Sequence, residues 1–172
     1  MVARRLSLWH DGGVGDEHSL KEPVVLLEEI FPGDTNAYGT AFGGKILALM
    51  DRAAGLVASR FAHRHFVTAS LDDMHFSAPV KQGEIAEVEA RLVYTSKHTY
   101  GVKVLVYAVD KTEWQRKPCG QGVFFMVATG PDGKPQAVKQ LEPEGKKARR
   151  DWDEVEAVHK AMLGRRRSTA GN

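Results

Sequence analysis

Apolar and polar side chains follow two different periods along the chain. Over residues 44–60, apolar side chains recur at helical spacing and also occupy the other helix faces, which predicts a buried helix. The positions at helical spacing are Ile46, Leu49, Met50, Ala53 and Val57. Over residues 84–95, apolar residues from Ala86 to Tyr94 alternate with charged ones, which predicts a strand with one buried face.

Further segments complete the predicted order of elements. Residues 23–30, 66–77 and 100–110 form extended runs, and residues 121–129 form a continuous apolar run that is typical of a strand covered on both faces. Residues 151–163 predict an amphipathic helix that makes apolar contacts through Trp152, Val155 and Met162. The order is one strand, one buried helix and four strands joined by short links.

This order indicates an α+β fold in which an antiparallel sheet wraps round one central buried helix. A single helix covers one sheet face, so we expect the other face or one edge to need a partner chain. A length of 172 residues suggests one domain. We expect a flexible lead-in over residues 1–21, the folded domain over residues 22–133 and a basic extension over residues 134–172.

Composition and charge argue against several classes of protein. The net charge is only +2, and the basic runs at residues 146–150 and 165–167 carry no interleaved aromatic residues, so we expect a solvated tail and no nucleic-acid partner. The single cysteine, Cys119, cannot form an intrachain disulfide. No apolar stretch is long enough to span a membrane. We therefore expect a cytoplasmic protein without a membrane partner.

Candidate chemistry is concentrated between Asn36 and Asp51, where the sequence reads NAYGTAFGGKILALMD. Gly43 and Gly44 open the predicted helix. The first N–H groups of a helix are unpaired and lie at the positive end of its dipole, which suits an oxyanion. The alternative is that the glycines allow close packing of the helix on the sheet, and glycines alone favour that interpretation.

Asp51 is a carboxylate in the middle of this apolar helix. It lies ~10 Å beyond Gly44 at ~1.5 Å per residue, too far to serve its own helix start. A two-fold-related chain could supply its own Asp51 to that start, which predicts a site shared between chains. The alternative is that Asp51 pairs with a core hydroxyl or with Arg52, although adjacent helical residues do not face each other.

The spacing of Asn36, Gly39, Phe42-Gly43-Gly44 and Asp51 resembles the signature of the hotdog-fold acyl-CoA thioesterases of the acyl-CoA hydrolase type. The resemblance spans about residues 22–130 and continues through residues 67–70, Phe76, residues 79–80 and Gly83. It implies hydrolysis of acyl-CoA to free fatty acid and coenzyme A without a cofactor or a metal. It also implies a hotdog fold that dimerises into a double hotdog and assembles into a hexamer, a trimer of dimers.

The resemblance also implies roles for individual residues. Asp51 would act as general base or as nucleophile, and Asn36 of the opposite subunit would orient the water or the thioester carbonyl. Backbone N–H groups near Gly39 or Gly43-Gly44 would hold the oxyanion. Tyr38 stands where the family frequently has histidine.

Substrate-binding residues are expected at Gly39 and Phe42, on the strand over residues 66–77 and in the hairpin link at residues 96–99. Thr68 and Ser70 would line the pantetheine channel, or would satisfy hydrogen bonds at a strand edge. Lys97 and Thr99 lie where similar enzymes often carry a G-R-T-S-like sequence near coenzyme A. Lys97 would contact a phosphate, or would be a solvated turn residue. We expect three histidines to be structural or surface residues and not metal ligands: His63, His65 and His75.

Two other functions stay open. A hotdog enoyl-CoA hydratase usually pairs an aspartate with a histidine a few residues later, whereas the first histidine after Asp51 is His63. A non-catalytic acyl-CoA-binding regulator would need a DNA-binding module, which residues 1–21 are too short to form. Cys119 is expected to be a packing residue and not a nucleophile.

Overall fold

The computed structural model describes residues 22–170, so the expected lead-in at residues 1–21 lies outside the described residues. The elements follow the predicted order. They are β1 (Val24–Glu29), the short 3-10 helix η1 (Pro32–Asp34), α2 (Gly43–Ala62), β2 (Phe66–Phe76), β3 (Ile85–Thr95), β4 (Thr99–Val109), β5 (Arg116–Ala128) and α3 (Gly145–Ala170). Among these residues, no helix is both long and apolar enough to span a bilayer.

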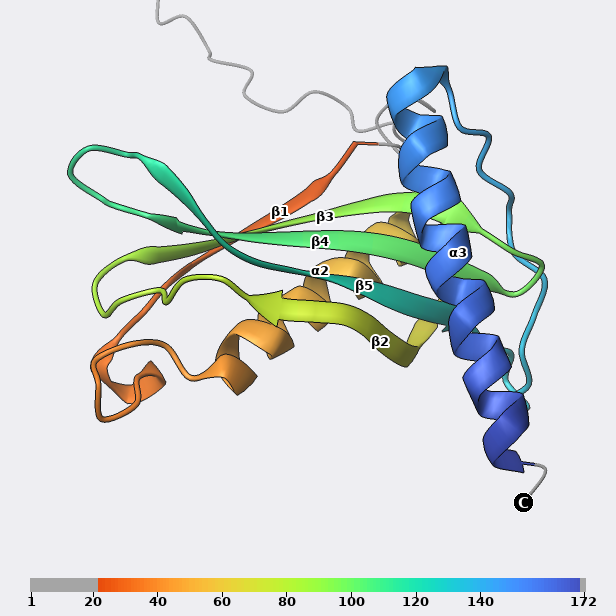
Figure 1. Ribbon diagram of the computed structural model, residues 1–172, viewed down its shortest axis with the longest axis horizontal. Coiled ribbons are helices and arrows are strands. Elements are labelled where there is room, and N and C mark those ends of the chain that lie inside the picture. Colours follow the sequence, from red (N-terminus) through yellow and green to blue (C-terminus); the bar gives the residue numbers. More distant parts are fainter. Residues whose placement is uncertain (1–21, 171–172) are drawn as a thin grey trace, which may run out of the picture.

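The five strands form one antiparallel sheet in the order β1-β3-β4-β5-β2. Figure 1 shows α2 behind this sheet and α3 lying across its front. The chain leaves β1, passes through α2 and returns as β2 at the far edge, so β1 and β2 are the two edge strands. The expected α+β architecture, a sheet wrapped round one long helix, is confirmed.

Two separate cores lie on the two faces of the sheet. The larger core holds the apolar face of α2 against the inner sheet face, with Phe124 and Met126 of β5. The smaller core holds Val155 and Met162 of α3 against Val123 and Phe125 of β5. The apolar run in β5 is therefore covered on both faces, as predicted. Of the two places where we expect a partner chain, the other sheet face is covered in part by α3 of the same chain.

A glycine fixes where α3 packs on the sheet. A Cβ atom at Gly101 of β4 would lie 2.5 Å from Cγ1 of Val155 and 3.0 Å from the Cβ of Tyr94. No side chain fits in that space, so the Val155 side chain packs directly on the backbone of Gly101. Tyr94 also packs edge-on against Trp152, with ring centroids 5.0 Å apart.

Strand irregularities explain the errors of the alternation rule. Tyr94 was expected to share a face with Ala86, but it lies in the core under α3, because β3 has a register shift between Leu92 and Tyr94. An extra residue in a strand moves the following side chains to the other face. Periodicity could not reveal this bulge, since Val93 and Tyr94 are both apolar.

Two elements are longer than expected. β5 begins at Arg116 instead of residue 121, because residues 116–120 also pair with β4, from Val109↔Arg116 onward. α3 extends the predicted 151–163 helix in both directions. Its added residues, mostly lysine, arginine and alanine, are good helix formers that bring no apolar periodicity.

Candidate active site

Asp51 lies on the face of α2 that points away from the sheet. Gly44, Ala48, Asp51 and Gly55 recur at helical spacing on this face, and the first three are exposed. Leu56 beside them is 51% exposed. The prediction that α2 is buried all round is therefore wrong for the single chain, because nothing in the described residues covers this stripe. An exposed apolar helix face is typical of a surface that a partner covers.

Thr68 of β2 holds the Asp51 carboxylate. Its hydroxyl donates a hydrogen bond to Oδ1 of Asp51 and lies 3.4 Å from the sulfur of Met126. The other oxygen, Oδ2, has no donor among residues 22–165. One oxygen is thus oriented by the edge strand, and the other is left to accept a proton. The hydroxyl partner that the sequence suggested for Asp51 exists, but it lies on an exposed surface.

The start of α2 presents two backbone donors. The carbonyl of Phe42 accepts from the N–H groups of Lys45 (2.9 Å) and Ile46 (3.2 Å). The N–H groups of Gly43 and Gly44 have no acceptor within the described part of the chain. A Cβ at Gly43 would lie 3.4 Å from the Phe76 ring, whereas a Cβ at Gly44 would meet nothing within 4 Å. Packing explains Gly43, and Gly44 is open to a ligand or a partner.

Lys45 positions this helix start. Its Nζ pairs with Glu28 of β1 at 2.8 Å and with Asp34 at 3.0 Å. The hydrogen bond to Glu28, followed by that to Asp34, raises the pKa of Lys45. The Lys45 hydrogen bond, followed by one from the Phe31 N–H, lowers the pKa of Asp34. These two carboxylates compensate a cation that would otherwise oppose the positive end of the helix dipole.

Asn36 organises the loop before α2. Its Oδ1 accepts the backbone N–H groups of Tyr38 (2.9 Å) and Thr40 (3.3 Å), and its Nδ2 donates to Oγ1 of Thr40 (3.0 Å). Gly39 follows with φ +70°, a conformation that glycine adopts without strain. Tyr38 points into solvent and is 90% exposed. Within one chain the Asn36 amide is engaged by its own loop.

Ser70 does not share a surface with Thr68. Its Oγ lies 2.7 Å from the sulfur of Met162 on α3. The cause is a register shift in β2 between Thr68 and Ser70, which turns the two side chains to opposite faces. The expectation that both residues line one channel is therefore wrong in this geometry.

The predicted site residues fall into three groups along α2. Asn36, Gly39, Phe42 and Gly43-Gly44 lie at its start, and Asp51 and Thr68 lie in the middle. Lys97 and Thr99 lie at its far end, where the neighbouring Tyr100 packs on Phe61. Gly44 and Phe61 are 17 positions apart, ~25 Å at the helical rise. A single chain therefore does not bring these groups together.

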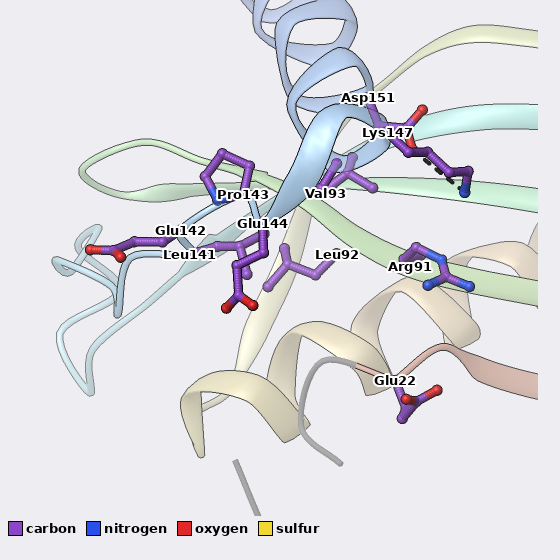
Figure 2. A pocket seen from close by; sticks show the side chains of 11 residues that line it. Glu22, Arg91, Leu92, Val93, Leu141, Glu142, Pro143, Glu144, Lys147 and Asp151 are labelled. Carbon is purple, nitrogen blue, oxygen red and sulfur yellow. Dashed lines mark ion pairs between the residues drawn. The ribbon is translucent and has the colours of Figure 1, made fainter. Parts of the chain in front are cut away.

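Two cavities lie at opposite ends of the molecule. One of about 370 Å³ opens beside Gly43, between the start of α2 and the end of β2. Another of about 340 Å³ lies between the start of α3 and the outer sheet face. Figure 2 shows the second cavity, with Lys147 facing Asp151 and with Glu142 and Glu144 at its rim. It contains none of the predicted site residues.

Other reactive side chains stay outside these groups. The described residues hold no cluster of three histidine, cysteine or acidic side chains that could bind a metal, and His63, His65 and His75 are exposed. Burial raises the pKa of the Cys119 thiol, which keeps it protonated and weakly nucleophilic. Sequence reasoning missed the Thr68–Asp51 hydrogen bond, because it depends on how β2 sits beside α2.

Comparison with known proteins matches residues 38–115 to the thioesterase superfamily. The chain is 30% identical over 175 residues to the mouse cytosolic acyl coenzyme A thioester hydrolase, covering 96% of this chain and 46% of the mouse protein. It thus spans about half the length of this curated relative. It is 36% identical to an uncharacterised acyl-CoA thioester hydrolase of Zymomonas mobilis, covering 70% of this chain and 80% of that protein.

Solved structures agree with these matches. A hexameric acyl-CoA thioesterase in its apo form superposes with a TM-score of 0.79 at 30% identity, over 84% of this chain and 93% of that one. The acyl-CoA hydrolase of Staphylococcus aureus, in complex with butyryl coenzyme A and coenzyme A, gives 0.79 at 26% identity, over 88% and 92%. Further structures of it carry alanine in place of an aspartate, a threonine or an asparagine. The chain therefore belongs to the thioesterase superfamily, in the hotdog-fold acyl-CoA thioester hydrolase family.

Proposed function

We propose that this protein hydrolyses acyl-CoA thioesters to free fatty acid and coenzyme A, at a site completed by a second copy of the chain. The observation that carries the proposal is the exposed Asp51 carboxylate, oriented by Thr68 on the open face of α2. At the start of the same helix, the N–H groups of Gly43 and Gly44 are available to bind an anion. A base and an oxyanion site are the two parts that thioester hydrolysis needs.

The reaction proceeds through attack of water on the thioester carbonyl carbon. Asp51 accepts the proton of this water, and the carbonyl oxygen becomes an oxyanion that the Gly43 and Gly44 N–H groups stabilise. The C–S bond then breaks, and the coenzyme A sulfur leaves and takes up a proton. A thiolate is a good leaving group, so a strong general acid is not needed. In the alternative, the Asp51 carboxylate attacks the carbonyl carbon, the C–S bond breaks, and coenzyme A leaves as a thiolate that takes up a proton. Water then hydrolyses the mixed anhydride, which releases the fatty acid and regenerates Asp51.

Two-fold symmetry brings the parts of the site together. If two α2 helices run antiparallel across an axis near Ala48, Gly44 of each chain lies opposite Asp51 of the other. Ala48 is small and exposed, so the helices can approach closely. β2 supports the same arrangement because it is an edge strand, and an edge strand can pair with a second copy of itself. Antiparallel helices also bring Lys97 and Thr99 of one chain towards the helix start of the other, where they would bind coenzyme A.

The Staphylococcus aureus structures supply an independent argument. The asparagine, aspartate and threonine replaced by alanine there lie 15 and 17 positions apart. Asn36, Asp51 and Thr68 have the same separations. Three residue types at matching spacing support their assignment to one site. We assign Asn36 the role of holding the loop that faces the partner's Asp51.

Assembly beyond the dimer is proposed from the relatives. A hexameric thioesterase is a close structural neighbour, which supports a trimer of dimers for this chain. The mouse relative is named cytosolic, which supports a cytoplasmic location.

Thiol release from a panel of acyl-CoAs tests the activity. Asp51→Asn should lower kcat by ~100-fold or more, the usual contribution of a general base, while coenzyme A binding and the thermal midpoint stay unchanged. Glu113→Gln, at the β4–β5 hairpin tip, is the matched charge control and should keep the wild-type rate. An equal rate for Asp51→Asn and wild type would refute the assignment. Binding of acyl-CoA without turnover by the wild type would favour a non-catalytic regulator.

Mixed dimers test the shared site. A Cβ at Gly44 enters open space, so Gly44→Val should fold but obstruct the oxyanion donors. Each single variant should be inactive. A dimer of one Asp51→Asn chain and one Gly44→Val chain keeps one intact site if the site is shared, and activity should return upon subunit exchange. No recovery after demonstrated exchange would place each site within one chain.

A further inference from the structure

The cavity beside Gly43 is lined mainly by apolar residues. Its floor consists of Ile46, Val80, Val106 and Cys119, all of which are almost fully buried. Ala41, Ala78 and Pro79 line its sides. Ser77 adds one hydroxyl to the lining, but no charged side chain lines the cavity. An aliphatic chain in contact with the apolar residues would therefore lose contact with water along that part of its length.

One of the two proposed oxyanion donors belongs to a residue that lines this cavity. Gly43 lines the cavity, and its N–H group is one of the two donors at the start of α2. A thioester whose carbonyl oxygen accepts from this N–H therefore has its carbonyl carbon at the mouth. The two substituents of that carbon must then diverge, with one able to enter the cavity and the other directed along the surface.

The Phe76 side chain lines the cavity, and its ring lies between two glycines. Its ring lies 3.4 Å from where a Cβ on Gly43 would be, and its Cδ1 lies 3.0 Å from where a Cβ on Gly120 would be. The ring is nevertheless 49% exposed. An aromatic side chain fixed between two glycines can narrow an opening without being part of the packed core.

We propose that this cavity binds the acyl chain of the thioester and that Phe76 limits the chain length it accepts. The proposal rests on the function proposed above and names the part of the substrate that this pocket recognises. A volume of about 370 Å³ compares with ~30 Å³ for one water-sized group. By that comparison the cavity holds about twelve such groups, so it accommodates short and medium acyl chains.

Two substitutions of opposite effect test the assignment on the acyl-CoA panel. Phe76→Ala should widen the rim and raise kcat/KM for palmitoyl-CoA relative to hexanoyl-CoA by about tenfold or more. Val106→Phe should fill the floor and lower kcat/KM for decanoyl-CoA about tenfold while acetyl-CoA hydrolysis is retained. Phe31→Ala is the matched control, since Phe31 is 58% exposed at the same end of the molecule but does not line the cavity.

Cys119 supplies a readout that does not depend on catalysis. It is the only cysteine in the chain, and it lies in the cavity floor. In the inactive Asp51→Asn protein, decanoyl-CoA should slow methanethiosulfonate labelling of Cys119 about tenfold, whereas coenzyme A alone should not. Because Val106→Phe inserts a large ring into the core, its thermal midpoint must be measured; Phe76→Ala and the labelling assay keep the test valid if that variant unfolds.

The outcomes separate the two proposals. An active wild type with an unchanged length profile in Phe76→Ala and no protection of Cys119 by decanoyl-CoA would overturn the pocket assignment and leave the hydrolase function intact. Protection of Cys119 without any thiol release by the wild type would support the pocket and refute hydrolysis.

Discussion

The proposed chemistry depends on a few groups, and the Asp51 carboxylate is the central one. Its carboxylate has one oxygen bound by the Thr68 hydroxyl, while the backbone donors lie seven positions earlier at Gly44. Fixing one oxygen restricts the rotation of the carboxylate, and Asp51 is exposed, so the second oxygen is free to accept from a bound water. This preorganisation is what a base needs in order to act on a bound water.

Removing the Thr68 hydroxyl should slow the chemical step. Thr68→Val keeps the β-branched shape on β2 but deletes a hydrogen bond to a charged group, which is worth ~1.5–3 kcal/mol. We expect kcat to fall by about 10- to 100-fold with little change in KM. Thr68→Ser should retain most of the rate in steady-state kinetics. A loss of the same size in the serine variant would argue for a packing role instead.

The Cys119 thiol should need a higher pH for labelling than a free cysteine does. Burial raises its pKa, so the reactive thiolate forms at a higher pH than in free cysteine. The midpoint of the labelling rate against pH in the ligand-free protein should therefore lie above that of a free cysteine under the same conditions. A midpoint at or below that of free cysteine would contradict this environment.

At the scale of elements, α3 is an integral part of the fold. It is held by the packing of Val155 on Gly101 and by the ion pair of Lys103 with Glu154 at 3.1 Å. Buried aromatic contacts add to this: the His159 ring stacks on Phe125 with centroids 4.9 Å apart. The helix therefore closes the outer core and shields apolar side chains of β5 from water.

A side chain at position 101, where Val155 packs, should weaken the packing of α3 on the sheet and lower the stability of the protein. Gly101→Ala forces overpacking at a site with no free space, which typically costs ~1–3 kcal/mol. Urea unfolding should show a lower midpoint. Gly164→Ala is the matched control, because a Cβ there meets nothing within 4 Å and alanine favours a helix by ~0.5–1 kcal/mol over glycine. Equal stability of the Gly101 variant and wild type would show that α3 shifts to make room.

At the scale of the whole molecule, the open face of α2 predicts self-association. Leu56 is 51% exposed on that face, beside Asp51. Leu56→Lys should shift the protein towards monomer in sedimentation velocity and lower the hydrolysis rate, while circular dichroism stays unchanged. Leu163→Lys is the control, because Leu163 is 39% exposed on α3 and away from this face. An active monomeric Leu56 variant would refute the shared site.

The sequence predicted the type and order of the elements because apolar periodicity reports burial directly. It also placed Asp51 and the glycine pair on one helix. It did not predict the bulges in β2 and β3, since a bulge depends on the pairing strand and leaves no periodic trace. For that reason it grouped Ser70 with Thr68, and it missed the position of Phe76 between two glycines.

The irregular edge of β2 has a consequence for behaviour at high concentration. A long, regular edge strand can recruit one chain after another into an open-ended sheet. β2 instead changes register twice, between Thr68 and Ser70 and between Asp72 and His75, and it carries two aspartates in that stretch. Such an edge accepts only a matching irregular strand, so strand pairing between copies should stop at a closed pair and resist fibre growth.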